Sequence, residues 1–307
     1  MFLNLRYTDR TDAVGSIAMN TKPRFELSAL PAIQNPADWE PYSHLALRYS
    51  TKLCNLTGLP DLSQETVEVY WGLRNLTATK DLIPASQLPA ITRVEFHSYT
   101  GRLVGRLINI VQHEIPDLPN QNALIFRLFG NAGLAHVVMF LRDNPVGHPF
   151  SELLSTRIRA SLEMIDIPTF QLRYPEMMLW ILIMGGLGGI GTDNQWWFTK
   201  LVAEMCHTTG IARTTEIPFF LTEFFWTDLY LYPTYTEFWN DVTEKVEGGN
   251  AVARVVDELD LASSESPPSL AGWLEFIALA GWSISQLANQ PTNQLNISVS
   301  QLMINIK

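Results

Sequence analysis

Apolar residues recur at helical spacing along most of this chain. One series at positions i, i+3, i+4, i+7 and i+11 runs from Tyr42 to Leu53, and a second with the same spacing runs from Tyr235 to Val246. Evenly spaced short strands separated by turns are not indicated anywhere between them. The sequence therefore predicts an all-α fold, a multi-helix bundle of roughly eight to eleven helices.

The 307 residues are 47% hydrophobic, enough to bury a core without disulfides or a structural metal. We expect an N-terminal, partly irregular segment over residues 1–35, a helical domain over 36–290 and a polar tail over 291–307. Within the helical domain, prolines indicate a loop over residues 77–90. Apolar residues at helical spacing predict a long, mostly buried helix over residues 121–142.

Charge is spread unevenly. The net charge is −10, and residues 214–307 hold twelve acidic and three basic residues. Such a balance argues against a duplex-binding module, because DNA affinity needs clustered lysine and arginine. A solvated acidic face is the simpler interpretation, and an acidic surface that recruits a basic partner is the alternative.

The chain has two cysteines, Cys54 and Cys206, without the spacing of a metal site. We expect two buried thiols in a reducing compartment, and no zinc or other cofactor. The first residues lack the pattern of a secretory signal, so secretion is not expected. The apolar run 177–184 and the glycines that follow to Gly191 are fifteen residues long. A membrane span needs about 20, so a buried core element is expected there, and no membrane partner.

Gly186, Gly188 and Gly191 satisfy the pattern G-x-G-x-x-G after an apolar run. In a dinucleotide-binding fold this pattern would indicate an NAD(P)-dependent oxidoreductase. Because periodic helices flank the glycines on both sides, we prefer a helix–helix corner at which glycines permit close packing.

Histidines and aromatic residues give no catalytic motif. The six histidines are scattered, and His136 lies in an apolar helix, which predicts a hydrogen-bonded core histidine. Aromatic residues at helical spacing favour core, with an apolar-ligand pocket beside Trp180, Trp196 and Trp197 as the alternative. We predict no catalytic residue, and hence no enzyme.

Residues 175–198, PEMMLWILIMGGLGGIGTDNQWWF, resemble a block in the helical regulatory domain of fungal zinc-cluster transcription regulators. The matching positions are Glu176, Leu179, Trp180, Gly185, Gly186, Thr192, Trp197 and Phe198. Further blocks of that family are similar in order and spacing to residues 96–110, 124–143, 153–166, 219–230 and 237–242. The resemblance covers about residues 94–245.

The resemblance implies a regulatory domain that binds protein partners or a small effector, with nuclear localisation, and it leaves a homodimer open. Without the family, a cytoplasmic protein is expected. The family reads DNA through six cysteines that hold two zinc ions, and two cysteines cannot supply them. Neither zinc nor direct nucleic-acid binding is therefore carried over. As effector pocket or structural corner, we name Trp180, Gly185, Gly186, Trp196, Trp197, Phe198, Phe224 and Trp239.

Overall fold

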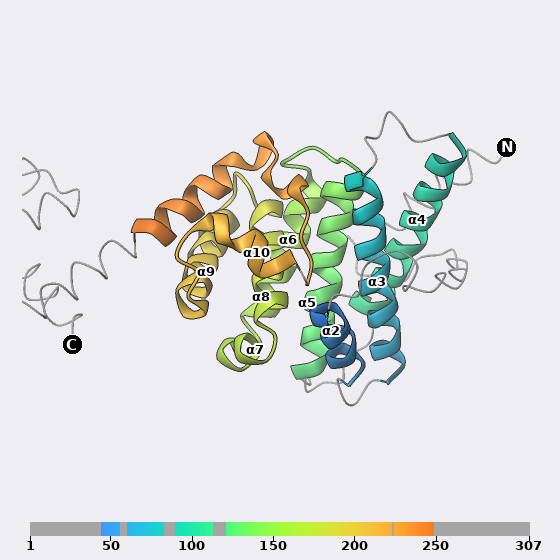
Figure 1. The fold of residues 1–307 in the computed structure, drawn as a ribbon, viewed down its shortest axis with the longest axis horizontal. Coiled ribbons are helices and arrows are strands. Elements are labelled where there is room, and N and C mark those ends of the chain that lie inside the picture. Colours follow the sequence, from blue (N-terminus) through green and yellow to red (C-terminus); the bar gives the residue numbers. More distant parts are fainter. Residues whose placement is uncertain (1–43, 56–59, 83–89, 113–120, 223, 249–307) are drawn as a thin grey trace, which may run out of the picture. The chain divides into compact units, whose positions relative to one another are not determined.

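The computed structural model describes residues 44–55, 60–82, 90–112, 121–222 and 224–248 (Figure 1). These residues form ten α-helices and no strand, which confirms the predicted all-α class. The helices are α2 (His44–Cys54), α3 (Pro60–Leu82), α4 (Ala90–Gln112), α5 (Gln121–His136), α6 (Pro149–Leu162), α7 (Ile167–Arg173), α8 (Pro175–Gly188), α9 (Asp193–Thr209), α10 (Ile217–Thr222) and a last helix over residues 236–248.

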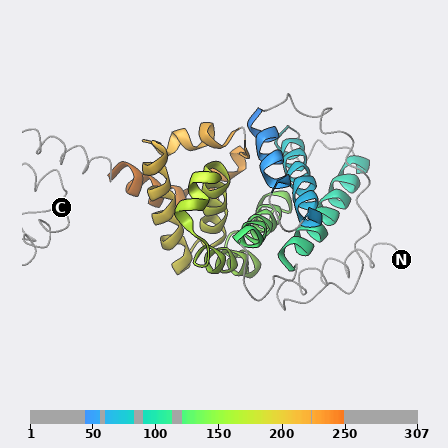
Figure 2. The same cartoon turned by 90° about the horizontal axis from the view of Figure 1, so that it is seen from below.

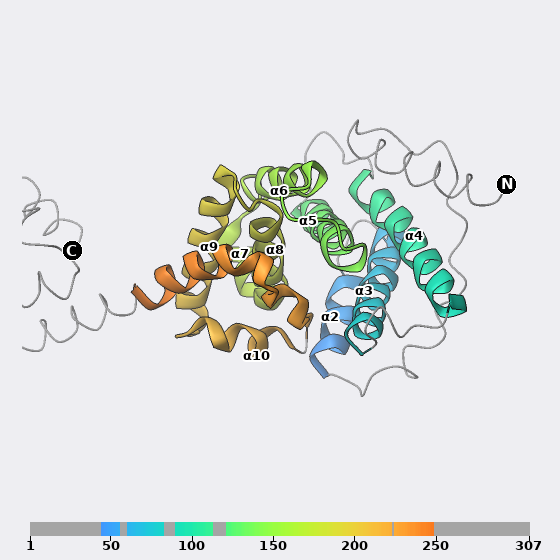
Figure 3. The same ribbon diagram turned by 90° about the horizontal axis from the view of Figure 1, so that it is seen from above.

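Helices α5 and α8 lie at the centre of one compact unit that ends at Val246. Helix α5 packs against α3 and α4 on one side and against α6 and α8 on the other, an arrangement visible in Figures 2 and 3. Helix α8 also packs against α6, α7 and α9. All residues of α8 from Met177 to Gly188 are buried, because a helix without a polar face must be covered on every side.

Helix α5 continues directly into a π-helix, η2 (Val137–Leu141). Together, Gln121–Leu141 form a 21-residue stretch whose most apolar 18-residue window has a mean hydropathy of 1.7, long and apolar enough to cross a membrane. Within the described ranges it is the one such helix, and 94% of its most apolar window is buried in the protein. This burial is what the core helix of a bundle requires, and it agrees with the long buried helix predicted over 121–142.

The loop predicted over residues 77–90 is wrong for its first six residues, because α3 runs to Leu82. Tertiary contacts hold this polar last turn in place. Lys80 Nζ lies 2.6 Å from Asp143 Oδ1, and Thr227 Oγ1 donates to Asp81 Oδ1 at 2.7 Å. Neither partner can be read from the local sequence. Residues 83–89 of that loop, the segment 1–35, both ends of the segment 36–290 and the tail 291–307 lie outside the described residues, and Ala90 already belongs to α4.

Candidate functional site

The corner between α8 and α9 is closed by glycines that face aromatic rings. A Cβ atom on Gly185 would overlap the ring of Phe198, and one on Gly186 would overlap the ring of Phe238. Thr192 then caps α9, since its hydroxyl donates to the Gly189 carbonyl at 2.7 Å and accepts from the amide of Asn194 at 3.3 Å. The glycines thus permit close contact between α8, α9 and the last helix.

The G-x-G-x-x-G pattern lies at the end of a helix. Gly186 and Gly188 are inside α8, and Gly191 has a left-handed φ of 79° in the turn that follows. A Cβ on Gly188 would lie 3.0 Å from the carbonyl oxygen of Ser151 in α6. Protein atoms therefore occupy the faces of Gly186 and Gly188, while a Cβ on Gly191 would meet no atom within 4 Å. The residues before the pattern are helical where a dinucleotide-binding fold needs a strand.

Four buried side chains form a continuous hydrogen-bond chain through the core. Trp180 Nε1 lies 3.0 Å from the Tyr230 hydroxyl, which lies 3.0 Å from His136 Nδ1. On the other side of the imidazole, Nε2 lies 2.8 Å from Thr77 Oγ1, which lies 2.8 Å from the carbonyl of Leu73. The chain links α8, the 3₁₀-helix η4 (Asp228–Leu231), α5 and α3.

The donors of this chain all point the same way. An indole N–H can only donate, and a main-chain carbonyl can only accept, so both ends of the chain are fixed. Trp180 therefore donates to Tyr230, Tyr230 donates to His136 Nδ1, and the protonated Nε2 of His136 donates to Thr77. Burial, together with the charge of Lys80, lowers the pKa of His136 to about 3 and keeps the ring neutral. The prediction of a hydrogen-bonded core histidine is confirmed.

Phe224 is the centre of an adjoining aromatic cluster. Its ring centroid lies 4.5 Å from Tyr49, 5.4 Å from Tyr70 and 6.0 Å from Trp180. Its carbonyl accepts from the hydroxyl of Tyr70 at 2.9 Å and from the guanidinium of Arg74. The space beside Trp180 and Phe224 is therefore filled by protein.

The other predicted site residues lie further out. Trp239 is half-buried and donates from Nε1 to the carbonyl of Tyr230 at 2.7 Å. Trp197 is half-buried, with the Arg159 guanidinium 5.2 Å from its ring. Trp196 is 62% exposed, so its assignment to a pocket with Trp180 is wrong. Neighbours on a helix point about 100° apart, and Trp196 and Trp197 cannot both face the core.

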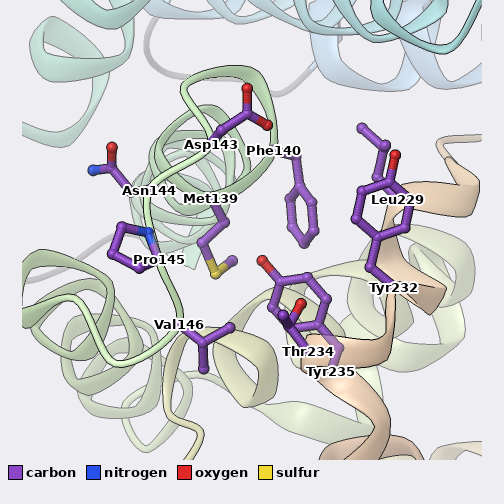
Figure 4. A pocket seen from close by; sticks show the side chains of 10 residues that line it. All are labelled: Met139, Phe140, Asp143, Asn144, Pro145, Val146, Leu229, Tyr232, Thr234 and Tyr235. Carbon is purple, nitrogen blue, oxygen red and sulfur yellow. The ribbon is translucent and has the colours of Figure 1, made fainter. Parts of the chain in front are cut away.

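The structure has a pocket at a different place, beside the π-helix η2 (Figure 4). It has a volume of ≈ 200 Å³ and is open to solvent on one side. Its walls come from η2, from the loop that follows η2, and from the region of η4 and η5 (Pro233–Tyr235). The lining residues are Met139, Phe140, Asp143, Asn144, Pro145, Val146, Leu229, Tyr232, Thr234 and Tyr235. None of the predicted site residues lines this pocket.

Two sequence signals mark the pocket in retrospect. The stretch 230–235, YLYPTY, places three tyrosines within six residues, and the segment 144–149, NPVGHP, interrupts helical spacing. Taken alone, the tyrosines are equally consistent with core residues, and the interrupted spacing with a break between two helices. These two segments come together because of the π-helix η2, and the spacing of apolar residues does not predict a π-helix.

The thiols differ from each other in their surroundings. Cys206 is buried, and burial raises its pKa to about 12, with Glu216 adding to the shift. Cys54 is exposed, so the prediction of two buried thiols is wrong for Cys54. It is the last residue of α2 and points about 100° away from the buried Leu53 around the helix. Over the described ranges, no three His, Cys, Asp or Glu side chains converge in a way that could hold a metal ion.

Comparison of the chain with family models, with curated proteins and with solved structures gave no match.

Proposed function

We propose that this chain is a helical regulatory domain of the type found in fungal zinc-cluster transcription regulators, and that it acts by binding a protein partner or a small effector. The domain needs no catalytic residue for this role. Binding that favours one of two states of the domain would change the activity of a DNA reader attached to it or associated with it.

The observation that carries the proposal is the meeting of three separate blocks of the resemblance. Phe198 of the block 175–198 packs on Gly185 of the same block, and Phe238 of the block 237–242 packs on Gly186. Tyr230 of the block 219–230 accepts from Trp180 and, through its carbonyl, from Trp239. Residues that match one family pattern are expected to pack on one another, which supports a shared fold over chance similarity.

The charge of the chain fits a role that leaves DNA reading to another segment or chain. With a net charge of −10 and two cysteines, we expect neither a zinc cluster nor sequence-specific duplex binding. A gel-shift titration at physiological salt tests this part. Tight, sequence-specific retardation of duplex DNA by the purified chain would contradict it.

The regulatory role itself is tested by fusing the full chain to a bacterial DNA-binding domain in a fungal reporter strain. The fusion should change reporter transcription relative to the DNA-binding domain alone, in either direction. Gly185→Val should abolish the change, because the new side chain overlaps Phe198 and disrupts the corner.

Gly101→Ala is the matched control, because a Cβ on Gly101 in α4 meets no atom within 4 Å. This variant should retain the full effect at equal expression. Reporter output equal to that of the DNA-binding domain alone, for a fusion shown to be folded and nuclear, would reject the regulatory proposal.

A further inference from the structure

The pocket beside η2 contains two departures from regular backbone. η2 is a π-helix, in which the amide of Arg142 donates to the carbonyl of Val137 at 2.9 Å, five residues back. Asp143 follows with a φ of 54°, and it is the one non-glycine residue with positive φ in the described ranges. π-Helices and left-handed non-glycine residues are both enriched at functional sites. Met139, Phe140 and Asp143, which carry these departures, all line the pocket.

Three of the ten residues that line the pocket are aromatic. Figure 4 shows Phe140, Tyr232 and Tyr235 on one side of the space and Pro145 and Val146 on the other. The ring centroids of Phe140 and Tyr235 are 5.2 Å apart, and both rings are buried at the base. Tyr232 is 52% exposed and forms a wall at the open side. Aromatic faces carry negative potential and attract cations that lie over them.

Asp143 is the charged residue among the ten that line the pocket. One of its oxygens is paired with Lys80 Nζ, but the Asp143 side chain remains 71% exposed while Lys80 is 13% exposed. Burial, and after it the charge of Asp143, raises the pKa of Tyr235 to about 12, so the negative charge acts at the base of the pocket. Asp143 and the aromatic faces therefore both favour a positively charged guest.

From this geometry we propose that the pocket binds an alkylated ammonium group, such as the head of a quaternary amine or a methylated lysine side chain. A strongly hydrated cation would lose too much solvation against Met139, Val146 and the rings, whereas an alkylated ammonium is weakly hydrated and matches an apolar wall. The volume of ≈ 200 Å³ lies below the roughly 300–1,000 Å³ of pockets for drug-sized ligands, which suits a headgroup whose remainder extends through the open side.

This proposal is independent of the proposed regulatory function, because it concerns which ligand the pocket binds and not the effect of that binding on transcription. Its test is a calorimetric and NMR titration of the full chain with three probes. Choline and N-acetyl-trimethyllysine amide carry the cation, and 3,3-dimethylbutan-1-ol replaces the ammonium nitrogen of choline with carbon. At least one cation should bind with a millimolar or lower dissociation constant, and about tenfold more tightly than the alcohol. The two cationic probes distinguish a free amine from a protein side chain as the source.

Two variants locate the binding. Tyr232→Leu removes an exposed aromatic wall and should weaken cation binding by about threefold or more. Asp143→Asn removes the charge and keeps a residue that tolerates positive φ, and it should bring the cation close to the affinity of the alcohol. Tyr99→Leu, at a similarly exposed tyrosine on α4, should leave the affinity unchanged.

Three results would overturn the proposal. The first is equal affinity for choline and its neutral isostere, which would make the pocket a site for apolar side chains. The second is the absence of binding by both cations. The third is unchanged cation affinity in Tyr232→Leu and Asp143→Asn, which would place the binding elsewhere. Tyr232 is exposed, so thermal unfolding of Tyr232→Leu should match that of the wild type. Asp143→Asn also loses the ion pair with Lys80 at the end of α3, so its fold is verified by a cooperative unfolding transition above the titration temperature.

Discussion

The hydroxyl of Tyr230 donates to Nδ1 of His136 at 3.0 Å, across 94 residues of chain and in a region shielded from water. Each of the two side chains also has a second partner: Trp180 donates to Tyr230, and His136 donates to Thr77. No member of this chain can be removed without leaving a buried polar atom on a neighbour.

Removal of the Tyr230 hydroxyl should therefore destabilise the folded protein. Tyr230→Phe leaves Trp180 Nε1 without its acceptor and His136 Nδ1 without its donor. Each orphaned buried group costs about 1–3 kcal/mol, so we expect a loss of at least about 2 kcal/mol in urea unfolding. Tyr232→Phe, at an exposed tyrosine two residues away, should change stability by less than about 0.5 kcal/mol. Equal losses of stability in the two variants would show that the hydrogen-bond chain contributes nothing to the stability of the fold.

The neutral His136 predicts a pH dependence with a definite sign. Its pKa is about 3 in the folded protein and 6.5 ordinarily, so the unfolded chain binds more protons between these values. Stability should fall as the pH drops through this window, by up to about 1.4 kcal/mol per pH unit, and be unaffected by this residue at higher pH. In paired denaturation series, His136→Gln should show a shallower slope over about pH 4–6. A parallel slope in the variant would rule out His136 as the source.

The glycine corner predicts an energetic coupling between two helices. Gly186→Ala should destabilise the protein by about 1–3 kcal/mol, because the methyl group overlaps the ring of Phe238. In a Phe238→Leu background the same change should cost less, and the double-mutant cycle measures the difference. Gly101→Ala should be neutral or stabilise the protein by up to about 1 kcal/mol. Strict additivity of the substitutions at 186 and 238 would contradict the contact.

The two tryptophans at the extremes of exposure should respond very differently to truncation. Trp180 is fully buried, so Trp180→Ala should cost about 3–5 kcal/mol. Trp196 is 62% exposed, and Trp196→Ala should stay within about 0.5 kcal/mol of the wild type. Chemical denaturation of both variants provides the comparison. Similar losses at the two sites would mean that Trp196 has a buried environment in solution.

The cysteines should separate into one fast and one slow thiol. Cys54 is exposed, whereas Cys206 is buried and has a pKa raised to about 12, so it forms little thiolate at neutral pH. We expect one rapid equivalent in a thiol-exchange assay of the folded chain and both equivalents in denaturant. Cys54→Ser should eliminate the rapid phase. A rapid phase that survives this substitution would place Cys206 at the surface.

Helical periodicity was enough to predict the all-α class and the burial of Gln121–Leu141, because both follow from which residues must leave water. Periodicity failed where contacts with residues distant in sequence determine the local structure. The last turn of α3 is held by Asp143 and Thr227, which lie far away in sequence. The prediction of a closely packed corner at Gly185 and Gly186 required only that glycines stand near aromatic residues in the sequence. The pocket needed a π-turn and a left-handed Asp143, which no spacing rule predicts.

The π-turn of Val137–Leu141 has a consequence for insertions and deletions in this chain. Because a π-turn contains one residue more than an α-turn, removal of a single residue there would let the stretch close as ordinary helix. Phe140 would then rotate by about 100° about the helix axis, away from Tyr235. One extra amino acid thus separates a bundle with a pocket beside Tyr232 from one without it, and a one-codon deletion would convert the first into the second while the core helices remain in place.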